Sequence, residues 1–373
     1  MTFCSKENVY KGEYCLSYHS SEMASSSVHN QQIADFNNVG QYMYETVFPA
    51  IYIVGNMGNL LSILIFSKKS WKKNVCVFYL KFFIFVNTCY ITSNILANIF
   101  INGFQTNLLN SSIILCKLYT YVSYILVCLS PTVLILASID RLLISSQKVD
   151  RRLYSSKRLA YFSLSINTFF WCAANTHAVI NISVREIFPS YFLCSFISSR
   201  IYTDFVTYLS AVLNVTFCLV MIVLCAVSFK NVRRIRAVPR EKRNQQIRTM
   251  NKKDFQLLRC LFVQDLVYIC FSMLAILFSV YQAVTRDQTR TAWDRALLNL
   301  VGRLVNVLYT MYFASSFFIS VIVSRAFRLE LKRLIYKIIG KNVNPIREEE
   351  NQFDTIAKDN AELNVVAVIV LPV

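Results

Sequence analysis

The sequence predicts an all-α membrane protein, a seven-transmembrane helix bundle with a short amphipathic cytoplasmic helix after the seventh span. Of the 373 residues, 55% are apolar and 16% are charged, and the mean hydropathy is +0.43. Soluble domains carry about 25% charged residues. Glycine and proline are scarce, with 7 and 6 residues, which disfavours turn-rich β architecture. The long apolar segments also exclude a porin-like barrel, whose strands are short and alternate in polarity.

Seven segments are long and apolar enough to cross a bilayer, which takes about 20 helical residues. Each must be helical because lipid offers no partner for open backbone groups. The expected spans are residues 43–67, 75–100, 113–139, 158–182, 202–229, 256–284 and 296–323. The chain then divides into an extracellular segment 1–42, a transmembrane domain 43–323, an amphipathic helix 324–340 and a cytoplasmic tail 341–373. No cleavable signal peptide is expected, because the N-terminal segment lacks an apolar core.

Basic residues are distributed unevenly about these spans. With the N-terminus outside, 29 of the 39 Lys and Arg residues lie on the cytoplasmic side and 8 on the outer side, the asymmetry that marks a cytoplasmic face. The net charge of +18 is therefore assigned to a face that meets anionic lipid, and no nucleic-acid partner is expected. Glycosylation sequons at Asn110 and Asn181 fall in outer loops, whereas a third at Asn214 lies within span 5 and should be unused.

Span 3 begins with a cysteine and ends with a charged pair. Cys116 opens the span, Asp140 and Arg141 close it, and Cys194 lies in the loop before span 5. Cys116 and Arg141 are 25 residues apart, about 37 Å along a helix, which is the distance between the two surfaces of a bilayer. With seven spans and this spacing, the chain resembles the rhodopsin-like (class A) G-protein-coupled receptors over roughly residues 43–340.

The resemblance implies roles for these four residues. A disulfide between Cys116 and Cys194 would fix the second outer loop over the mouth of the bundle. Both cysteines flank outer ends, where an oxidising exterior preserves disulfides, and two free buried thiols are the alternative. Asp140 would hold Arg141 at rest, and activation would free Arg141 to contact a heterotrimeric G protein. A charged pair that only extends toward the headgroups is the alternative for these two residues.

Four further residues correspond to family positions within the bundle. Asn59 would hydrogen-bond between helices at mid-depth, or would pack at an interface without a signalling role. Trp171 fits the span 4 tryptophan, and Ser316 begins a reduced form of the span 7 motif. Asn87 stands where the family has Asp, which removes the charge of the usual sodium pocket. Spans 6 and 7 depart most from the family pattern, which leaves their switching role open.

Two family-specific ligand contacts are absent from this sequence, which narrows the class of ligand. Aminergic receptors of the family carry an Asp 18 residues before the span 3 Arg, where this chain has Ser123. Opsins carry a Lys in span 7, and residues 296–323 contain none. The chain is similar to the divergent invertebrate FMRFamide-receptor-like group. A peptide-like ligand is therefore favoured over an amine or retinal.

The segment after span 7 has the pattern of an amphipathic helix. Phe327, Leu331, Leu334 and Ile335 share one face, which is expected to meet lipid while basic residues meet the headgroups.

Two ionisable residues, Asp265 in span 6 and Arg303 in span 7, lie in or near the membrane and are functional candidates for that reason. The sequence leaves open whether they pair or whether Arg303 extends toward the surface, because helix rotation is not readable from it.

No enzymatic chemistry is indicated. The three histidines make no metal or triad spacing, and there is no glycine-rich phosphate loop, so no cofactor is expected. The sequence favours a plasma-membrane receptor that passes the signal of an extracellular ligand to a heterotrimeric G protein. A transporter or channel with several spans, or a membrane scaffold without signalling, is the alternative.

Overall fold

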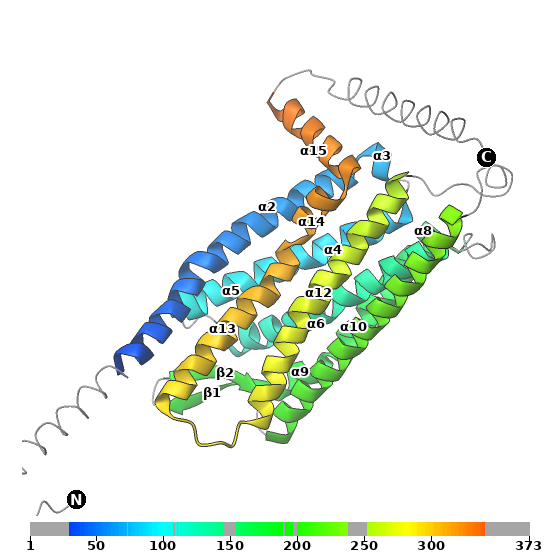
Figure 1. Ribbon diagram of the computed structural model, residues 1–373. Helices are drawn as coiled ribbons and strands as arrows, with labels where there is room; N and C mark the ends of the chain where they lie inside the picture. Colours follow the sequence, from blue (N-terminus) through cyan, green and yellow to red (C-terminus); the bar gives the residue numbers. More distant parts are fainter. Residues whose placement is uncertain are drawn as a thin grey trace, which may run out of the picture.

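The bundle is built from long helices that lie side by side along one axis (Figure 1). The structure, a computed structural model, describes residues 30–72, 74–106, 109, 111–144, 154–188, 191–196, 200–237 and 252–339. A two-stranded hairpin of β1 (Ile182–Phe188) and β2 (Tyr191–Phe196) lies at one end of the bundle, and helix α15 (Arg325–Ile338) turns away at the other. We call these the hairpin end and the α15 end.

The helices follow the order of the apolar segments. The first is helical from Asn30 to Phe66 and contains α2 (Phe48–Phe66). The second begins as α4 (Val75–Tyr90) and continues to Gly103. The other long helices are α6 (Ile113–Ile144), α8 (Lys157–Ala174), α10 (Arg200–Ala237), α12 (Lys252–Val284) and α13 (Ala292–Ala314). The short helices are α3 (Lys69–Lys72), α9 (Thr176–Asn181) and α14 (Ser316–Val323).

Six of the described helices are long and apolar enough to cross a membrane, so the chain is a multi-pass membrane protein. These six are Asn30–Phe66, Val75–Gly103, Ile113–Ile144, Ile201–Asn231, Asp254–Val284 and Ala292–Ala314, and they match six of the seven expected spans. The expected fourth span, 158–182, forms α8 and α9 with a turn between them at Asn175. Helix α8 begins with Lys157 and Arg158 and contains several hydroxyl and amide side chains, and it is not among the six.

Two other boundaries differ from the expectation. The first helix already includes Asn30, so residues 30–42 continue span 1 into the segment that was expected to be separate. Span 7 is divided at Ser315 into α13 and α14. The expected cytoplasmic tail, 341–373, lies outside the described residues.

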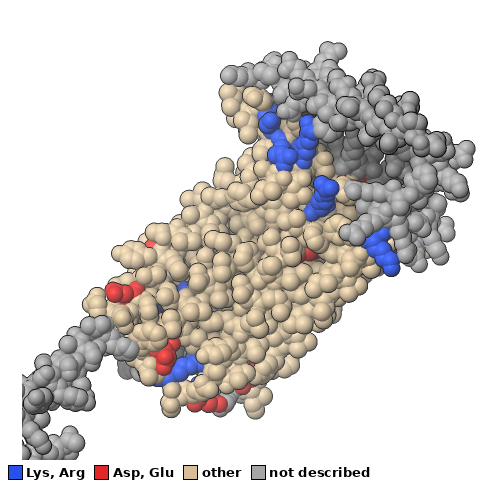
Figure 2. Space-filling view, viewed as in Figure 1, with Lys and Arg blue, Asp and Glu red and all other residues tan. Residues whose placement is uncertain are grey.

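Large apolar side chains cover the outside of the bundle. Ile53 on α2, Phe169 on α8, Val212 on α10 and Leu277 on α12 are each more than half exposed. The visible face in Figure 2 is mostly uncharged between its two ends, with most of the visible Lys and Arg toward the α15 end and acidic side chains together with some Lys or Arg toward the hairpin end. An apolar band of this kind suits lipid rather than water as the surrounding solvent.

Aromatic side chains fill the centre of the bundle. Tyr90 of α4 stacks on Phe313 of α13, with ring centroids 3.7 Å apart. Tyr312, which is fully buried, packs against Tyr268 of α12 at 5.1 Å and Phe83 of α4 at 6.2 Å. These contacts tie α4, α12 and α13 together and fix the helix positions on which the site depends.

Candidate functional site at the α15 end

Arg141, near the end of α6, is held by three side chains from three helices. Its guanidinium is fully buried and donates to Asp140 Oδ2 at 2.7 Å, to Asp254 Oδ1 at 3.0 Å and to Asn74 Oδ1 at 2.9 Å. Asp140 is 4% exposed and Asp254 is 17% exposed. A guanidinium offers five donors in a planar fork, which suits two carboxylates at once. We call Arg141, Asp140, Asp254 and Asn74 the arginine cluster.

The partners of Arg141 are themselves positioned by local sequence signals. Asn74 caps α4, and its Oδ1 accepts from the backbone N–H of Cys76 at 3.0 Å, the usual role of Asn before a helix. Its amide also donates to Asp254. Asp254 lies in the first turn of α12, where the helix dipole favours a negative charge. Ser155, just before α8, donates to Asp140 Oδ1 at 2.6 Å.

The arginine cluster therefore connects α4, α6 and α12, with Ser155 adding the start of α8. Hydrogen bonds to charged groups contribute about 1.5–3 kcal/mol each. Removing one partner of a buried ion pair costs about 3–5 kcal/mol when it leaves a charge uncompensated. Such a cluster can hold the ends of α6 and α12 together, and loss of a single acid would weaken that attachment.

Helix α15 is attached beside the arginine cluster. Gln256 of α12 accepts from Ser324 Oγ at 3.0 Å and from the backbone N–H of Ala326 at 2.9 Å. Lys68 forms an ion pair with Glu330 at 3.0 Å. The first turns of α12 thus contact both Arg141 and the segment that begins α15.

The apolar face of α15 was expected to meet lipid, and for Phe327 this was wrong. Phe327 is fully buried, and its ring lies 5.4 Å from that of Phe66 and 6.1 Å from that of Phe317. Leu331 and Leu334 are half-buried against the same core. The helical periodicity predicted the apolar face of α15 correctly. The short connection between α14 and α15, however, turns Phe327, the first residue of that face, into the bundle.

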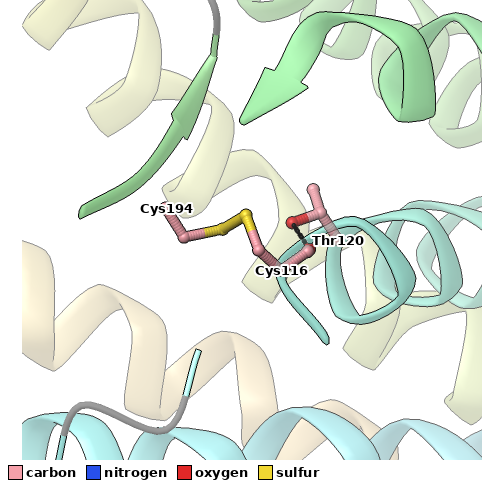
Figure 3. The surroundings of a disulfide bond; sticks show 3 residues. All are labelled: Cys116, Thr120 and Cys194. Carbon is pink, nitrogen blue, oxygen red and sulfur yellow. Dashed lines mark hydrogen bonds between the residues drawn. A yellow bond between two sulfur atoms is a disulfide. The ribbon is translucent and has the colours of Figure 1, made fainter. Parts of the chain in front are cut away.

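At the hairpin end, a disulfide joins Cys116 of α6 to Cys194 of β2, with Cα atoms 5.7 Å apart. Figure 3 shows the strand that carries Cys194 lying beside the start of α6, where Thr120 Oγ1 donates to the carbonyl of Cys116 at 2.9 Å. Cys194 pairs with Val184 in the antiparallel register of β1 and β2. The hairpin is therefore covalently fixed to the helix that carries Arg141 at its other end.

The residues expected to pack in the bundle are all buried. Asn87 Oδ1 accepts from Ser130 Oγ at 2.8 Å, and Trp171 Nε1 donates to Thr132 Oγ1 at 3.1 Å. Ser316 is 3% exposed. Asn87 and Trp171 thus each bond α6 from a neighbouring helix.

Asn59 had two alternative roles, a hydrogen bond between helices or packing at an interface. Its side chain is fully buried, but neither its oxygen nor its nitrogen has a hydrogen-bond partner among the described residues. Of the two alternatives for Asn59, the described residues therefore show a buried side chain without a hydrogen bond to another helix. Depth in the membrane can be read from position along the span, whereas a partner depends on how the facing helix is rotated.

Asp265 and Arg303, whose pairing the sequence left open, have separate partners. Asp265 Oδ2 accepts from Ser138 Oγ at 3.2 Å. Arg303 Nη1 donates to the carbonyl of Asn37 at 3.2 Å, and its guanidinium lies 5.9 Å from the centre of the Tyr44 ring. They do not pair, and Arg303 instead holds the first helix against α13.

The sequons fall in different surroundings. Asn110 lies outside the described residues. Asn181, at the end of α9 and half-exposed, donates to the carbonyl of His177 at 2.8 Å. Asn214 lies within α10, where its Oδ1 accepts from Tyr268 at 2.6 Å.

Sequence reasoning missed Asn74 and Asp254, two of the three partners of Arg141. Asn74 had a readable signal as an Asn before an apolar helix. Asp254 had no such signal, because nothing in the sequence pairs it with a residue 113 positions earlier.

The comparisons with known proteins leave the chain unassigned. No family model matches the sequence, and no curated protein matches it either. The function is therefore argued from the geometry of the arginine cluster and the disulfide.

Proposed function

We propose that the chain is a rhodopsin-like G-protein-coupled receptor that passes the signal of an extracellular, peptide-like ligand to a heterotrimeric G protein. The observation that carries the proposal is the buried Arg141, held between Asp140 of its own helix and Asp254 of α12. An ionic contact between two helix ends that is shielded from water is suited to a two-state device, because each state satisfies the arginine differently.

In the proposed mechanism, the structure corresponds to the resting state. Asp254 and Asn74 hold α12 and α4 to Arg141. Ligand binding at the hairpin end would favour a state in which the α15 end of α12 has moved away from α6. Arg141 would then leave Asp254 and contact the G protein. The ligand need only bind the open state more tightly than the resting state to shift the population.

The ligand would bind between the outer halves of the helices, beneath the hairpin. The disulfide between Cys116 and Cys194 fixes that hairpin to α6, so the outer wall of the site moves with the helix that carries Arg141. A peptide-like ligand is favoured because the positions of the amine and retinal contacts hold Ser123 and no span 7 lysine.

We propose that α8 also crosses the membrane, as the fourth span in chain order, which brings the number of spans to seven. Its two faces differ: Ala160, Leu164 and Trp171 are buried in the bundle, while Phe162 and Phe169 are 64% and 76% exposed. A helix with one face packed on its neighbours and large apolar side chains on the other is suited to lipid. With α9 it extends the membrane segment toward the disulfide.

The proposed orientation places the N-terminus outside and the α15 end in the cytoplasm of the plasma membrane. It is supported by the basic residues gathered at the α15 end (Figure 2) and by the disulfide at the hairpin end. Anionic lipid attracts basic side chains to the cytoplasmic face, and disulfides persist on the oxidising side.

The proposal is tested by second-messenger output in cells that express the wild-type chain or Arg141→Ala at equal surface density. Arg141→Ala is expected to abolish basal and ligand-evoked output, because it removes the proposed G-protein contact. Arg286→Ala is the matched control, since Arg286 forms an ion pair of 2.9 Å with Asp204 at the hairpin end. Equal output from Arg141→Ala and the wild type would favour a scaffold or a transporter and would overturn the receptor mechanism.

A further inference from the structure

A second polar contact joins α6, α10 and α12, apart from the arginine cluster. Asp265 of α12 is 1% exposed. Its Oδ2 accepts from Ser138 Oγ of α6 at 3.2 Å and from Cys225 Sγ of α10 at 3.2 Å. Asp265 lies 11 residues after Asp254 along α12, about three turns further toward the hairpin end.

A small cavity adjoins this carboxyl. Ser138, Cys225, Ser228 and Asp265 are its polar lining, and the other four lining residues are leucines and phenylalanines of α10 and α12. Its volume of about 10 Å³ is roughly that of one water-sized probe. The second carboxyl oxygen, Asp265 Oδ1, is buried and has no hydrogen-bond partner among the described residues.

The surroundings decide the charge of this carboxyl. None of the eight lining residues is Lys, Arg or His, so an ionised Asp265 would be a buried charge with no counter-ion among the residues that line the cavity. Such a charge costs many kcal/mol in an apolar interior, and a carboxyl avoids that cost by keeping its proton. The contacts fit a protonated carboxyl. Oδ2 accepts two hydrogen bonds, as a carbonyl oxygen does, and Oδ1 would carry the proton and act as a donor.

We propose that Asp265 is a protonated latch that holds α12 to α6 and α10 and donates its hydroxyl to one water molecule bound in the cavity. Movement of α12 away from α6 would separate Asp265 from Ser138, so the latch would oppose the same movement as the arginine cluster. That coupling to signalling rests on the proposed function. The protonated carboxyl and its bound water do not.

The first test is infrared spectroscopy of the purified full chain, which detects the carbonyl stretch of a protonated carboxylic acid. The wild type is expected to show a band that Asp265→Asn lacks. Ser138→Ala and Cys225→Ala are expected to shift this band, because each removes a hydrogen bond to the carbonyl oxygen. A wild-type spectrum that matches that of Asp265→Asn in this region would mean that the carboxyl is ionised and would overturn the proposal.

Thermal unfolding provides a second readout that does not need a G protein. Asp265→Asn is expected to unfold near the wild-type temperature, because its amide can accept and donate as the protonated acid does. If Asp265→Asn fails to fold, the band shifts of Ser138→Ala and Cys225→Ala decide the question. Unshifted bands in both would overturn the latch.

Basal second-messenger output tests the coupling. Ser138→Ala is expected to raise it by about two- to tenfold, the factor that corresponds to losing one neutral hydrogen bond of about 0.5–1.5 kcal/mol. Unchanged output together with the expected infrared bands would refute the coupling of the latch to signalling and leave the protonated site standing. Absence of any output in the wild type would instead contradict the proposed function.

Discussion

Replacing Asp254 with Asn is expected to release α12 from α6 and raise basal signalling. Asp254 Oδ1 lies 3.0 Å from Arg141 Nη1, and Asn keeps the size and one acceptor while removing the charge. Arg141 keeps Asp140 as its counter-ion at 2.7 Å. The variant therefore loses a charge-assisted hydrogen bond without leaving the arginine uncompensated.

The free-energy change expected for Asp254→Asn depends on the ion pair that remains between Arg141 and Asp140. Leaving a buried charge unpaired costs about 3–5 kcal/mol, but here the loss is nearer the value of one hydrogen bond to a charged group, about 1.5–3 kcal/mol. That energy changes the ratio of open to resting receptor by about 10- to 150-fold. If about 1% of the wild type is open at rest, the variant would be about 10–60% open.

The assay is basal second-messenger output without ligand, divided by the number of receptors at the cell surface. Asp204→Asn is the matched control, because Asp204 and Arg286 form an ion pair of 2.9 Å whose side chains are 30% and 39% exposed. Exposed pairs contribute about 0–1 kcal/mol. The control is therefore expected to change basal output little.

Two results would refute the reasoning. Wild-type output from Asp254→Asn at equal surface density would show that the Arg141–Asp254 contact does not hold the resting state. An equal rise in Asp204→Asn would show that the effect follows from any lost acid rather than from this contact.

Three further predictions concern the bundle. Cys194→Ser should lower thermal stability by about 2–4 kcal/mol by opening a disulfide loop, and a reducing agent should lower the melting temperature of the wild type but not of the variant. Gly58→Ala should lower stability by about 1–3 kcal/mol through overpacking, because its Cβ would lie 2.8 Å from that of Phe317; an unchanged melting temperature would contradict that close approach. Asn181→Gln should increase electrophoretic mobility by one glycan and Asn214→Gln should not, and the reverse pattern would overturn the proposed topology.

The spans were predictable because the bilayer imposes a length and a composition on any segment that crosses it. Six of the seven expected segments coincide with apolar helices that are long enough. The fourth was the exception, because Lys157, Arg158 and several hydroxyl and amide side chains lower the hydropathy of α8, although it packs beside α6 and α4. The first helix and α6 extend beyond the expected spans, because the described parts of these helices include Asn30 and Ile144.

The candidate site was predictable only in part. Cys116, Asp140 and Arg141 were found because they lie on one helix, where distance follows from residue number. Asp254 was missed because its contact with Arg141 joins two helices. The partner of Asp265 could not be predicted for the same reason.

The sequence by itself determined which segments are helical and apolar and how far Arg141 lies from Cys116 along α6. It did so because a helix has a fixed rise per residue, and because a long apolar segment in lipid satisfies its own backbone groups as a helix. Only the tertiary structure decided which acids reach Arg141, that Arg303 bonds the first helix rather than Asp265, and that Phe327 is buried. Those outcomes depend on the rotation and tilt of each helix against its neighbours, which are set by the packing of all the helices together.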